Sequence, residues 1–162
     1  MGENTGVSAE YLRSRLSYDP ESGEFRWRDA RADCVGAVAG KREHHGYVQI
    51  VIDRRAYMAA RLAWLYMTGS WPEAEIDHRN GAKADNRWDN LRPASRSENC
   101  ANKPKQANNT SGHRGVSRHG ARWRAQINID GRRTLLGVFK TPEDAAACYR
   151  KAYEKYFGEF AK

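Results

Sequence analysis

The sequence predicts an α+β protein built from two parts. Strand-like alternation and helix-like periodicity both occur on each side of a polar stretch that lies about two thirds of the way along the chain. That stretch, PKQANNTSG at 104–112, has almost no apolar residue and predicts a linker. A chain of 162 residues is long enough for one domain or two small ones.

The composition excludes several classes of protein. A 20-residue apolar run is absent, so no segment is predicted to span a membrane. The N-terminal MGENTGVSAE lacks the basic and apolar regions of a secretory signal. Three scattered cysteines predict neither a disulfide framework nor a zinc site of the CxxC type. We therefore expect a protein of a reducing cytoplasm.

The positive charge is concentrated in one stretch. The formal net charge is +8, and residues 101–135 alone hold eight basic residues and one acid. Residues 1–100 hold 15 basic and 15 acidic residues, so they contribute no net charge. Such a block is typical of a surface that binds a polyanion, most often nucleic acid. A solvated basic face is the alternative.

The first part of the chain begins with a predicted helix at Ser8 and a turn at 19–23. Strands are expected at 24–28 and 46–52, because these segments are rich in alternating and β-branched residues. The apolar segment 56–68 predicts a mostly buried helix that ends at Gly69.

A short helix is predicted to follow residue 95. Ser95 and Glu98 form a capping box, in which each side chain bonds the other's backbone N–H. Asn99 then lies in the first turns of this helix.

The second part predicts a three-stranded antiparallel sheet packed on one helix. Strands are expected at 114–118, 122–129 and 132–139, the last two joined by the two-residue turn Asp130-Gly131. Thr141 and Pro142 open the helix, and Gly158 ends it. Its expected buried stripe is Ala145, Cys148, Tyr149, Ala152 and Tyr156.

The hairpin register predicts two unlike faces. A two-residue turn pairs Ile129 with Arg132, and paired residues share a face. The inward face would hold Trp123, Ala125, Ile127, Thr134, Leu136 and Val138. The outward face would hold Arg122, Arg124, Gln126, Asn128, Arg133 and Leu135. Phe139 would also fall outward, so we expect the register to break near Gly137. The outward face suits contacts to phosphates and base edges, with a solvated sheet face as the alternative.

The candidate catalytic residues lie in the polar segment after residue 75. Asp77 and the Asn99 amide offer hard oxygen ligands for a divalent cation. His78 can take a proton near neutral pH, and Asn90 could accept its other ring N–H. The turn at 79–81 predicts that a strand ends at His78. Taken alone, Asp-His is also compatible with a loop Asp beside a surface His.

The segment IDHRNGAKADNRWDNLRPASRSENCANK, within 75–103, resembles the HNH, or ββα-metal, nuclease motif of phage and intron homing endonucleases. The resemblance implies a nuclease domain over 1–103 in which His78 activates water and Asn90 orients His78. It also implies that Asp77 and Asn99 hold one Mg²⁺ (or Mn²⁺), and no structural zinc is expected. Relatives often have His where this chain has Ala60. A phage-encoded protein in a bacterial cytoplasm is the implied setting.

Residues 111–161 resemble the plant ethylene-response-factor (Apetala-type) DNA-binding domain, which predicts a DNA-binding domain over 113–162. The resemblance is carried by Arg114-Gly115-Val116, Trp123, Leu136-Gly137, Phe139 and Ala145-Ala146. It implies that the sheet enters the major groove of DNA. The expected DNA-binding residues are Arg114, Arg118, Arg122, Arg124, Gln126, Asn128, Arg132 and Arg133.

Together these features predict a metal-dependent endonuclease of the homing type that nicks double-stranded DNA and is positioned by its C-terminal sheet. A dimer or two encounters would be needed for a paired cut, and no membrane partner is expected. Two alternatives remain: a non-catalytic DNA-binding regulator with a decayed HNH region, and a protein that binds or cuts RNA.

Overall fold

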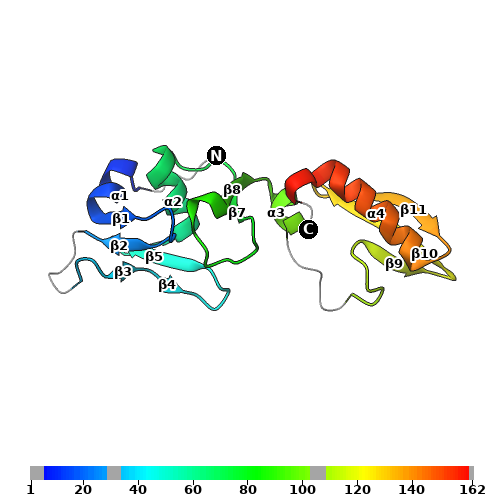
Figure 1. Ribbon diagram of the computed structural model, residues 1–162. Coiled ribbons are helices and arrows are strands. Elements are labelled where there is room, and N and C mark those ends of the chain that lie inside the picture. The colour runs from blue at the N-terminus through cyan, green and yellow to red at the C-terminus, as the bar shows by residue number, and fades with distance from the viewer. Residues whose placement is uncertain (1–5, 29–33, 103–108, 161–162) are drawn as a thin grey trace. The chain divides into compact units, whose positions relative to one another are not determined.

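The computed structural model describes residues 6–28, 34–102 and 109–160, and it confirms the α+β class (Figure 1). Of the expected linker, residues 104–108 lie outside the described ranges. Within those ranges, no helix has both the length and the apolarity that a membrane span requires.

The contacts within the chain define two units, Met1–Ala94 and Ser95–Lys162. The helix that follows residue 95 thus belongs to the second unit by its contacts, whereas the sequence groups it with the nuclease motif. Each unit has its own apolar core.

The first unit begins with a helix and a three-stranded sheet. Helix α1 (Ala9–Arg15) is capped by Ser8, whose side chain accepts from the Tyr11 N–H, as predicted. Strands β1 (Leu16–Tyr18), β2 (Phe25–Trp27) and β3 (Val38–Ala39) pair in that order. The turn between β1 and β2 therefore lies at the predicted position.

The predicted helix 56–68 begins later than expected, because its first residues belong to a second sheet. It contains β4 (Lys41–Arg42), β5 (Val48–Ile52) and β6 (Arg55–Met58). Asp53 and Arg54 have positive φ and turn the chain back on itself, so 55–58 pairs with β5. Helix α2 (Ala59–Thr68) begins only after this pairing ends, and Gly69 closes it in the left-handed conformation as predicted.

Helices α1 and α2 pack on each other, and α2 also packs on β5 and β6 (Figure 1). The helix α2 supplies five buried apolar residues to the core: Ala59, Ala60, Leu62, Ala63 and Leu65. Ala60, the position where the resemblance led us to expect His, is thus an apolar core position in this chain.

The nuclease motif forms a two-stranded sheet, β7 (Glu75–His78) and β8 (Leu91–Ala94). The connection between them ends in a short 3₁₀ helix, η1 (Trp88–Asn90). Helix α3 (Arg96–Asn102) then opens with the predicted capping box, since Ser95 and Glu98 exchange hydrogen bonds of 2.7 and 3.2 Å.

The second unit contains strands β9 (Val116–His119), β10 (Arg122–Ile129) and β11 (Arg132–Phe139), with β10 in the centre. Helix α4 (Pro142–Phe157) packs along this sheet, followed by η2 (Gly158–Phe160) (Figure 1). The turn is confirmed, because Asp130 and Gly131 both have positive φ. The Thr141 cap and the Gly158 end of α4 are also confirmed.

The register breaks near Gly137 as expected, and the break moves two side chains. Pairing passes from Gln126–Leu135 to Ala125–Gly137, so Leu136 is the extra residue of a β-bulge. Val138 therefore pairs with Arg124 and is exposed, so its predicted inward position is wrong. Phe139 instead packs against the core.

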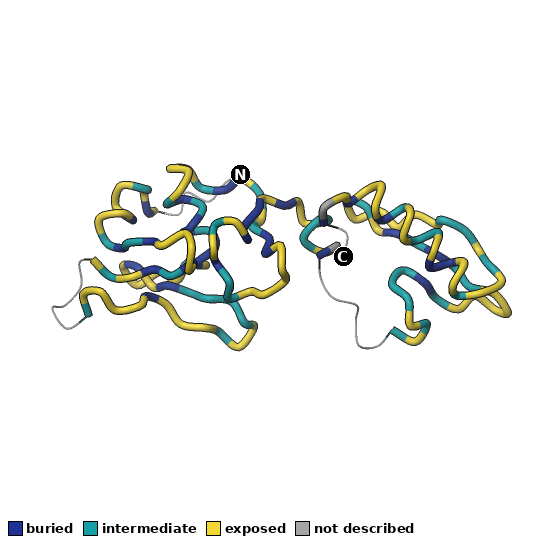
Figure 2. The backbone as a smooth tube through the Cα atoms, in the orientation of Figure 1, coloured by how far each residue is buried: buried dark blue, intermediate teal, exposed yellow. Residues whose placement is uncertain are grey.

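The buried stripe of α4 also differs at its end. Exposed and buried segments alternate along the helix (Figure 2), and Tyr153 and Phe157 are buried whereas Tyr156 is 52% exposed. The prediction for Tyr156 is wrong, because beyond Tyr149 the buried positions follow a spacing of four residues, through Tyr153 to Phe157.

The packing of Gly115 against α4 gives a stability prediction. A Cβ at Gly115 would lie 1.9 Å from a ring carbon of Tyr149, and its φ is +68°. Gly115→Ala should destabilise the C-terminal unit by about 1–3 kcal/mol through overpacking, with backbone strain in addition. Gly112→Ala is the matched control, because its φ is +75° and a Cβ there meets open space. Equal losses for both variants in denaturant unfolding would contradict the packing account.

Candidate active site

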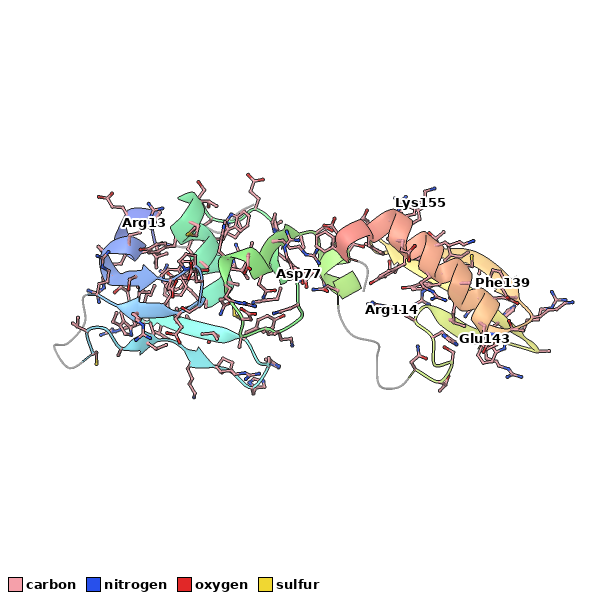
Figure 3. The ribbon with its side chains drawn as sticks, viewed as in Figure 1. Arg13, Asp77, Arg114, Phe139, Glu143 and Lys155 are labelled. Carbon is pink, nitrogen blue, oxygen red and sulfur yellow. The ribbon has the colours of Figure 1, made fainter. Side chains whose placement is uncertain are left out.

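Asp77 and His78 are the last two residues of β7, so the predicted strand end at His78 is confirmed. Across the sheet, Asp77 pairs with Arg92 and His78 with Leu91. The Gly81 N–H donates to the His78 carbonyl at 2.8 Å, which turns the chain sharply after the strand. Both side chains are nearly fully buried, at 4% and 5% exposure, in the N-terminal unit, where Figure 3 labels Asp77.

The buried amide of Asn90 holds the connection between the two strands. Its Oδ1 accepts from the Asn80 N–H at 3.0 Å, and its Nδ2 donates to the Asp85 carbonyl at 2.7 Å. The Asn90 carbonyl also accepts from the Arg79 N–H at 2.8 Å. Asn90 therefore fixes the course of residues 79–90, which we call the catalytic loop. Its expected role of orienting His78 stays a prediction.

Asn86 is a partner of the His78 ring that sequence reasoning missed. The His78 Nε2 lies 3.2 Å from the Asn86 Oδ1. The Asn86 Nδ2 donates to the Ala84 carbonyl at 3.3 Å, so the amide oxygen faces the ring. Nε2 must then carry the proton and donate, which leaves the lone pair on Nδ1. In the sequence, Asn86 is indicated only by its place in the Asp85-Asn86-Arg87 part of the motif.

Burial sets the charge state of His78. It lowers the pKa of the imidazole below its ordinary value, against the opposing effects of the Asn86 hydrogen bond and the Asp77 charge. The neutral ring, which can accept a proton, is therefore favoured at pH 7.

Asp77 faces a buried cation that sequence reasoning also missed. The Arg92 Nε donates to the Asp77 Oδ2 at 2.9 Å, and both side chains are nearly inaccessible to solvent. The carboxylate is thus charge-compensated from within the sheet. The alternation of β8 could have indicated this pairing, because an Arg directly opposite an Asp on a hairpin shares its face.

The available donors fit a hard cation better than a soft one. Asp77 in the N-terminal unit offers a carboxylate, a ligand type that Mg²⁺ prefers, whereas Asn99, the other expected ligand, lies in α3 of the C-terminal unit. In the described part of the chain, no three His, Cys, Asp or Glu side chains gather as a metal cluster.

The expected DNA-binding residues lie on or beside the β9–β11 sheet. Five of them are exposed: Arg118, Arg122, Asn128, Arg132 and Arg133. Arg124 and Gln126 are partly buried, and Arg124 shares its face with exposed Val138. Arg114, labelled in Figure 3, donates to the Cys100 carbonyl at 3.2 Å and lies over the Tyr153 ring. Its guanidinium thus has contacts within the C-terminal unit.

Comparison with known proteins agrees with this reading of the first unit. Residues 57–101 match a family model described as HNH endonuclease. The match covers α2, β7, the catalytic loop, β8 and most of α3, but less than half of the chain. It supports an HNH nuclease. No curated protein matches the chain.

The buried Asp77–Arg92 pair gives a second stability prediction. Arg92→Met should cost about 3–5 kcal/mol, because it leaves a buried carboxylate without its cation. Adding Asp77→Leu should recover much of that loss, as the unpaired charge is then gone. Denaturant unfolding without added metal is the measurement.

The exposed pair of Arg26 and Glu24 is the control for this effect. Their side chains are 49% and 44% exposed, so Arg26→Met should cost less than about 1 kcal/mol. A loss of that small size for Arg92→Met would mean that Asp77 does not depend on Arg92.

Proposed function

We propose that this chain is a metal-dependent endonuclease that hydrolyses a phosphodiester bond in double-stranded DNA. The observation that carries the proposal is the buried His78, whose Nε2 meets the Asn86 amide oxygen, beside Asp77 and within the segment similar to HNH endonucleases. A histidine whose ring orientation is fixed in this way can serve as a general base.

In the proposed reaction, His78 Nδ1 takes a proton from water while the water oxygen attacks the scissile phosphorus. The bond from phosphorus to the 3′ oxygen breaks and this oxygen takes a proton from solvent, so the products carry a 5′ phosphate and a 3′ hydroxyl. The imidazolium that forms lies beside the Asp77 carboxylate, whose charge favours the protonated ring. Asn86 keeps the ring orientation throughout.

Asp77 and Asn99 would hold one Mg²⁺ (or Mn²⁺). When bound, the ion supplies positive charge that stabilises the phosphate and the leaving oxygen. We propose that the nuclease domain spans 1–103, so that it includes Asn99 of α3, and that residues 113–162 form the DNA-binding domain.

The basic sheet of the C-terminal unit is proposed to position the cut. Its exposed arginines would hold the phosphate backbone, with Gln126 and Asn128 placed for base edges. With one site per chain, nicking is the simplest outcome. A homing enzyme encoded by a phage and acting in the bacterial cytoplasm is the proposed setting.

A DNA-binding regulator that does not cut is the second candidate. The observation in its favour is that Arg92 already compensates the charge of Asp77. Ala60, at the position where the resemblance led us to expect His, is buried in the core.

A plasmid assay separates the two candidates. Wild-type protein should relax supercoiled DNA in Mg²⁺ and lose this activity in EDTA, and His78→Ala should reduce the rate at least about 100-fold because the base is lost. His119→Ala is the control for loss of an imidazole, because His119 is an exposed histidine of β9. The regulator reading would be supported if wild type and His78→Ala both bind DNA and neither cuts it.

The sheet face is tested by binding. Arg133→Ala should weaken DNA binding by about 1–3 kcal/mol if the residue reads a base, or lower the salt slope by about 1 if it holds a phosphate. Arg150→Ala removes the same charge from the exposed side of α4 and should change neither quantity appreciably. Equal effects of the two variants on affinity and salt slope would show that the sheet is not the binding face.

A further inference from the structure

The N-terminal turn, residues 18–24, packs directly on the catalytic loop. This turn precedes the segment that matches the HNH endonuclease family. It is rigid, because the Asp19 side chain accepts from the Glu21 N–H and the Ser22 hydroxyl, and the Gly23 N–H donates to the Asp19 carbonyl. A stiff element from outside the motif thus abuts the loop that carries Asn86 and Asn90.

A buried hydrogen bond joins Tyr18 to the residue that holds His78. The Tyr18 hydroxyl donates to the Asn86 carbonyl at 2.6 Å, and the two residues are 7% and 3% exposed. Asn86 in turn meets the His78 Nε2 through its side chain. The chain of contacts therefore runs from Tyr18 through Asn86 to the imidazole, without leaving the interior of the N-terminal unit.

The Tyr18 side chain is itself fixed as a donor. Its ring lies 4.7 Å from that of Phe25 and 5.7 Å from that of Tyr66, centroid to centroid. Burial raises the pKa of the Tyr18 hydroxyl well above its usual range, with the Asp19 charge acting in the same direction. The hydroxyl therefore keeps its proton under any ordinary assay condition.

Two backbone contacts reinforce the same junction. The Trp88 N–H donates to the Pro20 carbonyl at 3.0 Å. A Cβ built on Gly23 would lie 2.4 Å from both the Asn86 carbonyl carbon and the Arg87 nitrogen. Only glycine allows the turn to approach the loop this closely.

We propose that Tyr18 is a positioning residue of the nuclease site, and that the N-terminal turn holds Asn86 so that the His78 ring keeps its orientation, with Nε2 toward the Asn86 amide oxygen. This inference rests on the proposed function, since it assigns Tyr18 a role in the same reaction. Its general basis is that a reacting group misplaced by about 1 Å can lose up to about 100-fold in rate. The expected effect falls on the chemical step, because Tyr18 is buried away from DNA.

The test compares two tyrosine variants that each remove one hydroxyl from the same aromatic cluster. Tyr18→Phe should lower kcat for duplex cleavage about 10-fold and leave KM for DNA unchanged. Tyr66→Phe should leave both constants close to wild type. In the Asn86→Ala background, adding Tyr18→Phe should cause no further loss, because Tyr18 acts through Asn86.

A glycine pair gives an independent test. Gly23→Ala should lower kcat more than Gly36→Ala, although φ is +74° at Gly23 and +81° at Gly36. A Cβ at Gly36 meets no atom within 4 Å, so that variant carries the backbone strain without the push on the catalytic loop.

A spectroscopic readout keeps this inference separate from the nuclease proposal. The ¹⁵N chemical shifts of the His78 ring should show the Nε2–H tautomer in the wild type and a mixture of tautomers in Tyr18→Phe. Absence of cleavage by wild type would overturn the proposed function, and the ring shifts would still decide the role of Tyr18. Identical shifts in wild type and Tyr18→Phe, or equal kcat values in an active enzyme, would overturn the inference.

Discussion

The buried amide of Asn90 is the constraint on which the rest of the site depends. Residues 79–83 of the connection between β7 and β8 are exposed, whereas Asn86 and Asn90 are buried, and a buried polar group without a hydrogen bond costs about 1–3 kcal/mol. Asn90 meets this need by accepting from Asn80 and donating to the Asp85 carbonyl. The loop is then closed, Asn86 faces inward, and the His78 ring has a partner for Nε2.

Two neighbouring titratable residues acquire different environments on this short hairpin. Asp77 faces the Arg92 guanidinium across the strand pair, whereas His78 faces the neutral amide of Asn86. The proposed mechanism uses both of these side chains, which belong to adjacent residues at the end of β7. Their different partners come from different elements, since Arg92 lies in β8 and Asn86 in the loop before it.

Local chemistry made several elements predictable from the sequence. The Ser95–Glu98 capping box, the Asp130-Gly131 turn and the Thr141 cap each depend on side chains within a few residues, and all three are present. The strand β6 was not predicted, because apolar residues before α2 fit a helix as well as a strand and only pairing with β5 decides. The sequence predicted a register break near Gly137 but not that Leu136 would be the extra residue of the bulge. That position depends on how Phe139 reaches the core.

The residues of the candidate site also divide into those that the local sequence indicates and those that only the folded chain brings together. His78 and Asp77 stand in the motif and could be selected from it, whereas Asn86 and Arg92 act through contacts that only the folded hairpin brings about. Tyr18 is further still, since 68 residues separate it from Asn86 in the chain. No spacing rule connects such residues. In the sequence, a tyrosine at the end of a short strand cannot be told from an ordinary core residue. Its contact with Asn86 becomes evident only in the folded structure.

End analysis of single-turnover cleavage tests the central claim most directly. A duplex labelled at either end, with enzyme in excess and Mg²⁺ present, should yield products that carry a 5′ phosphate and a 3′ hydroxyl, and His78→Ala should form them far more slowly. Products with a 3′ phosphate, or equal rates with and without the His78 imidazole, would contradict the assignment of His78 as the base that activates water.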